Sequence, residues 1–95
     1  MRFHREVVHI LNANGTERGS ATAALWATIA WDGAERWGGT VHLPFLNSAQ
    51  VVPTEVGTRV RLRFPDGQGG WAMITRYDGG VRQRARFKGD DKAPF

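Results

Sequence analysis

The segment Thr-Arg-Val-Arg-Leu-Arg-Phe, residues 58–64, alternates charged and apolar side chains almost without a break. Successive side chains of a β-strand point to opposite faces, so the three apolar residues would share one face and the three arginines the other. The apolar set is Val60, Leu62 and Phe64, and the cationic set is Arg59, Arg61 and Arg63. This period of two predicts a strand with one buried face, because a helix would repeat about every 3.6 residues.

Five further segments of the chain predict strands. They are residues 3–12, 21–31, 35–43, 71–77 and 81–88. Twelve glycines and four prolines divide the chain into pieces that are mostly too short for helices. The dipeptides Asn14-Gly15 and Asp32-Gly33 follow the first two segments and favour tight hairpin turns, because these residue types tolerate positive φ.

Residues 21–31 are the place where helix and strand compete. Five alanines favour a helix, whereas the threonines, the tryptophans and Ile29 favour a strand. As a strand, the segment places all its odd-numbered residues, from Ala21 to Trp31, on one apolar face. We therefore expect a strand, with Trp26 on the opposite face.

The turn Tyr77-Asp78-Gly79-Gly80 sets which residues of the last two strands face the core. A three-residue turn with a bulge is common, and it places Tyr77 opposite Val81. The inward set is then Trp71, Met73, Thr75, Tyr77, Ala85 and Phe87, and the outward set is Arg76, Arg82, Arg84, Arg86 and Lys88. Burial favours this register over a two-residue turn, because each large apolar side chain hidden contributes about 1.5–3 kcal/mol.

Six such strands in a chain of 95 residues predict a single all-β domain over residues 1–95. We expect a small antiparallel β-barrel or rolled sheet with meander-like strand order, because closure removes exposed edges. The chain has no cysteine, which excludes a disulfide scaffold and a thiolate metal site. No apolar run approaches about 18 residues and no signal-peptide pattern begins the chain, so a cytoplasmic location is expected.

The net charge of +4 is unevenly distributed. Residues 58–88 hold eight basic and two acidic residues, a net of +6. Two arginine stripes contribute most of this charge: Arg59, Arg61 and Arg63 in one strand, and Arg82, Arg84 and Arg86 in another. Because arginine binds phosphate through paired hydrogen bonds, the stripes predict an anion-binding surface, with nucleic acid as one candidate. The alternative is a solvated outer face whose arginine stems cover apolar surface.

Four tryptophans in this short chain predict an aromatic-lined pocket at a barrel mouth. We expect Trp31, Trp37 and Trp71 to form its apolar lining, with Arg36 and Tyr77 as polar groups at the rim. Packing of the same tryptophans in the core is the alternative. On the opposite strand face, Trp26 is expected to contact a partner protein or a second subunit, unless the chain ends cover it.

Metal-binding and catalytic patterns are not found in the sequence. His4 and His9 lie five residues apart on one expected strand, so they face opposite sides and cannot chelate one metal. Ser20 and Ser48 lie in no nucleophile motif, and no spacing pairs two carboxylates. We therefore predict no catalytic residue, no metal and no cofactor, and whether the protein is an enzyme stays open.

Two segments carry a family resemblance. Residues 32–41 read Asp-Gly-Ala-Glu-Arg-Trp-Gly-Gly-Thr-Val, and residues 60–67 read Val-Arg-Leu-Arg-Phe-Pro-Asp-Gly, followed by an alternating strand and a finish on Ala93-Pro94-Phe95. Over roughly residues 30–95, the chain resembles an actinobacterial domain of unknown function that occurs alone or attached to flavin-dependent monooxygenases. It departs from the family's closing Gly-x-Gly-x-Pro-Pro-Phe. The resemblance implies a setting in oxidoreductase or secondary metabolism and no particular reaction.

Three functions follow as expectations. The first is a non-catalytic β-barrel module that binds a small organic ligand or a protein partner, accessory to an oxidoreductase or biosynthetic system. The second is an anion-binding or nucleic-acid-binding barrel that uses its arginine stripes. The third is a small barrel cyclase or isomerase. No membrane contact is expected, and the sequence leaves open whether the chain forms a homodimer.

Overall fold

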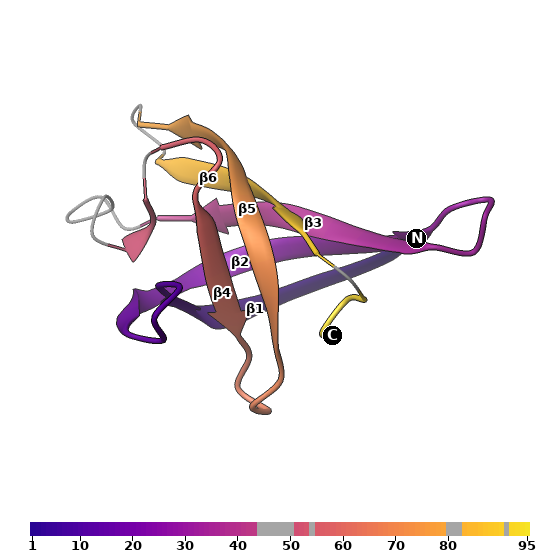
Figure 1. Cartoon of the computed structure of the whole chain (residues 1–95), viewed down its shortest axis with the longest axis horizontal. Helices are drawn as coiled ribbons and strands as arrows, with labels where there is room; N and C mark the ends of the chain where they lie inside the picture. Colours follow the sequence, from indigo (N-terminus) through magenta and orange to yellow (C-terminus); the bar gives the residue numbers. More distant parts are fainter. Residues whose placement is uncertain (44–50, 54, 80–82, 91) are drawn as a thin grey trace.

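The computed structural model describes residues 1–43, 51–53, 55–79, 83–90 and 92–95. Six antiparallel strands close into a barrel, which confirms the predicted fold class (Figure 1). The strands are β1 (Arg2–Leu11), β2 (Glu17–Ile29), β3 (Glu35–His42), β4 (Arg59–Arg63), β5 (Gly69–Asp78) and β6 (Arg84–Gly89). The described residues include no helix long and apolar enough to cross a membrane.

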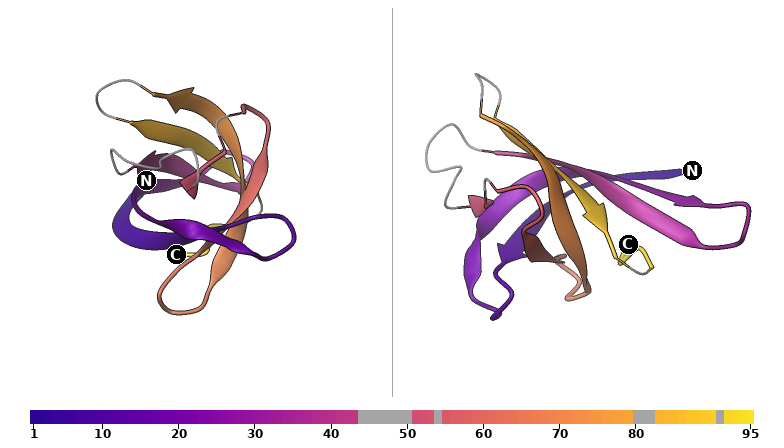
Figure 2. Two further views of the ribbon diagram at one scale, coloured as in Figure 1. Left: turned by 90° about the vertical axis from the view of Figure 1, so that its left-hand side faces the viewer. Right: turned by 45° about the horizontal axis from the view of Figure 1, so that its top comes forward.

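The strand order is β1-β2-β3-β6-β5-β4, with β4 pairing back to β1. The expectation of a simple meander is therefore wrong, because β6 lies beside β3 and β4 closes the barrel against β1. Residues just before β4 are consistent with this order, because they belong to the core and not to an exposed hairpin turn. Val51 and Val52, in the connection between β3 and β4, are buried in the core, so the chain is held against the barrel before β4 begins. Two three-stranded meanders result, and Figure 2 shows them wrapping around a common interior.

The core follows the predicted alternation on most strands. Its members on β2, β3, β4 and β6 are Ala21, Ala23, Leu25, Ala27, Trp37, Val41, Val60, Leu62, Ala85 and Phe87, and Val8 and Ile10 add to it from β1. The alanines of β2 have a packing role, because Ala27 lies directly opposite Trp37 and leaves room for its ring. The strand assignment of this segment is confirmed.

The inward face of β5 differs from the prediction. Ala72 and Ile74 are buried, while Met73 is 39% exposed and Trp71 is only partly buried. The expected pairing of Tyr77 with Val81 is wrong, since Tyr77 lies opposite Ala85, and a register shift between Ile74 and Arg76 places Ile74 opposite Phe87. Because the irregularity reverses the phase of the strand, Tyr77 packs against the core as predicted. The inward facing predicted for Trp71, Met73 and Thr75 is wrong.

Strands β1, β2 and β3 continue past the barrel as an extension that ends in the β2–β3 turn (Figure 1). The molecule accordingly measures 40 × 26 × 23 Å. Ile29 is 71% exposed and Trp31, in the turn, is 99% exposed. Both residues were expected on the apolar face, but the strand has left the barrel before it reaches them.

Candidate functional site

Trp37 is a core residue, and it has no exposed surface. Its indole Nε1 donates a hydrogen bond of 3.0 Å to the carbonyl oxygen of Asp90. Two glycines allow the ring to lie where it does. A Cβ built on Gly89 would lie 1.8 Å from the ring, and one on Gly70 would lie 2.9 Å from it. Trp37 is therefore packed in the core, which was the alternative to its predicted place in a pocket lining.

The C-terminal segment covers this end of the barrel. The Phe95 ring makes edge contacts with Trp37 and Phe64, each with ring centroids 6.0 Å apart. His4 stacks on the same ring at 5.6 Å, and the Arg2 guanidinium lies over it at 5.7 Å. Access to Trp37 from this side is closed by the chain itself.

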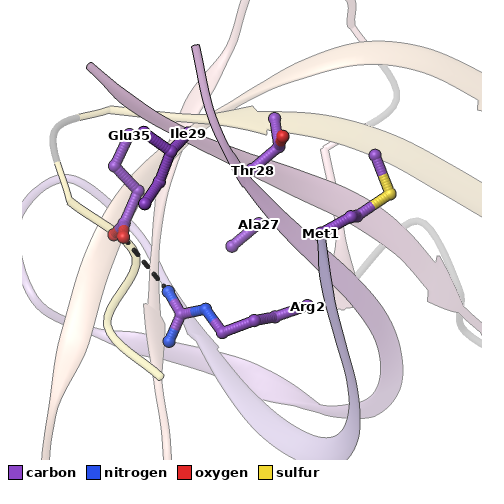
Figure 3. A pocket seen from close by; sticks show the side chains of 6 residues that line it. All are labelled: Met1, Arg2, Ala27, Thr28, Ile29 and Glu35. Carbon is purple, nitrogen blue, oxygen red and sulfur yellow. Dashed lines mark hydrogen bonds and ion pairs between the residues drawn. The ribbon is translucent and has the colours of Figure 1, made fainter. Parts of the chain in front are cut away.

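Polar contacts hold the same segment in place. Arg2 and Glu35 form an ion pair of 3.2 Å beside a shallow hollow that also involves Met1, Ala27, Thr28 and Ile29 (Figure 3). The second carboxylate oxygen of Glu35 accepts a hydrogen bond of 2.6 Å from the backbone N–H of Ala93. Arg2 also donates to the carbonyl oxygen of Phe95 at 3.0 Å. A single carboxylate thus links the extension to the C-terminal segment.

The expected aromatic pocket is not assembled. Trp37 is buried, Trp31 lies at the tip of the extension, and Trp71 lies on the outside of β5 under the Arg59 guanidinium at 5.2 Å. Tyr77 lies near the C-terminal end of β5, whereas Trp71 lies near its start, and the Tyr77 side chain packs against the core. It therefore forms no pocket rim with Arg36. The three tryptophans predicted to line one pocket therefore lie in three separate places.

An open groove of about 480 Å³ lies instead on the outer face of the barrel. Its lining comes from β2, β3, β5 and β6, and the residues are Trp26, Arg36, Gly39, Thr40, Thr75, Arg86, Phe87 and Lys88. We call this feature the outer groove. It exists because β3 pairs with β6, which places Gly38 opposite Lys88 and Thr40 opposite Arg86.

The charge of the outer groove is entirely positive. Its ionisable lining residues are Arg36, Arg86 and Lys88, all exposed, and no acidic side chain lines it. Within the described part of the chain, none of the three forms an ion pair. The hydroxyl groups of Thr40 and Thr75 add neutral hydrogen-bonding capacity.

A second group of cations continues from the groove along β5 and β6. Arg76 lies directly opposite Arg86, and Arg84 lies opposite Asp78, with 3.7 Å between their charged groups. Arg76, Asp78, Arg84 and Arg86 together line a smaller hollow. Like charges directly opposite each other on paired strands destabilise a sheet, and Asp78, the acidic residue of this hollow, forms an ion pair with Arg84 and not with Arg76 or Arg86.

The arginine stripe of β4 is different, because acidic side chains partly neutralise it. Arg59 pairs with Asp90 at 2.5 Å, and Arg63 lies 3.6 Å from Glu17. Arg61 is exposed and forms no ion pair with another described residue. We therefore take β6 and its neighbours as the candidate site, and β4 as its flank.

Some residues of this site were predicted for other roles or missed. Arg84 and Arg86 were predicted for anion binding, whereas Arg82 lies outside the described residues. Arg36 was expected at a pocket rim and Trp26 at a partner contact, yet both line the outer groove. Lys88, Arg76, Thr40 and Thr75 were not named as site residues. Alternation identified the outward cations of β6 but placed Thr75 inward, and the β3–β6 pairing that brings these residues together has no local signal.

Metal ligands do not gather in the described part of the chain, where no three His, Asp or Glu side chains form a group. His4 contacts Glu6 at 2.5 Å, and His9 contacts Glu17. These two pairs lie on the surface, and each has a single carboxylate.

No family model, no curated protein and no solved structure matches this chain. The resemblance of residues 30–95 to the actinobacterial domain stays a prediction from its motifs. Fold and site define a small closed β-barrel with a cationic outer groove.

Proposed function

We propose that the protein is a binding module that holds a nucleic acid on its outer groove. The observation that carries the proposal is the concentration of Arg36, Arg76, Arg86 and Lys88 on adjoining strands without an acidic partner among the described residues. Polyanion binding gives such a cluster a function, because the phosphates supply the negative charge that the surface lacks.

A solvated outer face is the simplest alternative for these arginines. It explains the β4 stripe, whose cations are interspersed with acidic partners. It does not explain why Arg76 and Arg86 occupy directly opposed positions, where repulsion between the two charges destabilises the sheet. A phosphate between them removes that repulsion, because guanidinium groups bind phosphate through paired hydrogen bonds.

An interior ligand pocket has less support. The tryptophans expected to line it do not converge, and Phe95 covers Trp37 at the barrel end. An accessory role beside an oxidoreductase rests on the family resemblance. We propose no reaction, since no group of the outer groove is an acid, a base or a nucleophile with a matched partner.

Replacing Arg76 with glutamine tests the proposal, because binding and stability should change in opposite directions. Removing one of two opposed cations should raise the free energy of unfolding by about 0.2–1 kcal/mol. The same change should weaken oligonucleotide binding about 10-fold, through loss of one charge-assisted contact worth about 1.5 kcal/mol. Denaturant unfolding and fluorescence anisotropy with a labelled oligonucleotide measure the two effects.

Arg84→Gln is the matched control for the stability measurement. It removes a cation that has an acidic partner, Asp78, at 3.7 Å, so it should not stabilise the fold. A destabilised Arg76→Gln variant, or one that binds like the wild type, would contradict the proposal. A wild-type protein that binds no oligonucleotide at low salt would remove it altogether.

A further inference from the structure

We infer that the outer groove takes single-stranded nucleic acid, with an unpaired base stacked on Trp26. This inference rests on the proposed function and names its substrate class. The cations of the groove attract any polyanion, so the choice between single strand and duplex depends on the aromatic side chain among them.

Gly38 fixes the position of the Trp26 ring. A Cβ on Gly38 would lie 3.0 Å from the Cζ2 atom of Trp26 and 2.7 Å from the carbonyl oxygen of Phe87. The edge of the indole therefore lies against the bare backbone of β3, and a Cβ at position 38 would crowd both this ring and the backbone of β6. A ring held in place by the sheet loses little conformational freedom when a base stacks on it.

Trp26 is also the tryptophan best placed for such a contact. It is half-buried, and within the described residues no aromatic ring or cation lies over it. Trp37 is enclosed in the core, and Trp71 is already covered by Arg59. Trp31 is 99% exposed, so nothing holds its ring in a fixed orientation.

Cations line the same groove as Trp26. Gly38 lies between Trp26 on β2 and Lys88 on β6, since it pairs with both. Arg86 follows Lys88 on the same face of β6, about 6.8 Å further along the strand. A base on the indole would thus have its flanking phosphates within reach of Lys88 and Arg86, and Arg36 lines the same groove.

Duplex nucleic acid does not fit this arrangement. Its bases are stacked on one another, so their faces are closed to an aromatic side chain on the surface of a sheet. A duplex could contact the outer cations only through its phosphates. A single strand offers both an unpaired base face and a flexible backbone, and therefore uses the aromatic and the charged parts of the groove together.

The test compares four fluorescein-labelled or competing probes by anisotropy: a 12-nucleotide oligo(dT), an oligo(rU) of the same length, a DNA duplex of that length and inorganic polyphosphate. The wild type should bind both single strands more tightly than the duplex. Trp26→Ala should weaken single-strand binding about 5- to 150-fold, the range for one lost stacked base, and leave polyphosphate binding unchanged. The two single strands distinguish DNA from RNA as the preferred source of the bases.

Two further variants keep the result interpretable. Trp26→Phe retains a stacking ring and should bind within about 5-fold of the wild type. Oligo(dT) should quench the tryptophan emission of the wild type but not that of this variant. Trp31→Ala removes an exposed indole outside the groove and should bind like the wild type. Circular dichroism establishes that each variant is folded.

The outcomes separate this inference from the proposed function. If Trp26→Ala binds oligo(dT) like the wild type while Arg76→Gln is weakened, the groove binds polyanions without base stacking and the inference is overturned. Duplex binding as tight as single-strand binding overturns it as well. If no probe binds, the proposed function itself has failed.

Discussion

Substituting alanine for Gly89 is expected to lower the free energy of unfolding by at least about 3 kcal/mol, the upper end of typical overpacking costs. The added Cβ would lie 1.8 Å from the Trp37 ring. That ring cannot move aside, because it is fully buried, hydrogen-bonded to the Asp90 carbonyl and in contact with Phe87 and Phe95. For a domain of this size, the loss corresponds to a fall in Tm of about 12 °C or more.

Gly67→Ala is the matched control for this substitution. Gly67 has φ of +88° and no atom within 4 Å of the new Cβ, so alanine there meets backbone strain and no clash. Its expected cost is about 1–2 kcal/mol. Combining Gly89→Ala with Trp37→Leu should largely remove the effect of the alanine, which a double-mutant cycle measures. A Gly89→Ala protein that melts within a few degrees of the wild type would show that Trp37 is not packed as described.

Reversing the charge of Arg86 and Lys88 together should have the largest effect on binding. The double glutamate variant loses two charged contacts and places two repulsive charges in the outer groove. We expect the affinity for a single-stranded oligonucleotide to fall by about 100-fold or more, since two charge-assisted contacts contribute about 3 kcal/mol. Fluorescence anisotropy at low salt measures the loss.

The control reverses Arg5 and Arg61, two exposed cations outside the groove that form no ion pair with other described residues. Both double variants change the net charge from +4 to 0, because two cations become two anions. Binding that depends on overall charge would fall equally in both proteins. Binding in the outer groove predicts a loss within about 5-fold for the control, since it keeps the local contacts.

Alternation along single strands predicted most of the barrel. Val60 and Leu62 face the core as expected, and the odd-numbered residues of β2 are buried from Ala21 to Ala27. The same pattern fails at Trp31, because periodicity records which face a residue shares but not where the strand leaves the barrel. It fails again at Trp71, because the irregularity near Thr75 reverses the phase within β5.

The site was predicted only in pieces, since its assembly depends on strand order. A closed meander would have placed β6 beside β1, with two strands between it and Arg36 on β3. In the observed fold β6 pairs with β3, and Val51 and Val52, which precede β4, are buried in the core although their segment has no periodicity. No local pattern distinguishes that segment from an exposed loop.

The central claim is that the outer groove binds a single strand through its phosphates, and the salt dependence of affinity tests it most directly. For wild-type protein and oligo(dT), log K against log salt should fall with a slope of about −2 to −3, about −0.7 for each of three or four neutralised phosphates. Affinity would then drop about 10- to 20-fold between 50 and 150 mM salt. A slope near zero, or no binding at 50 mM salt, would contradict the claim.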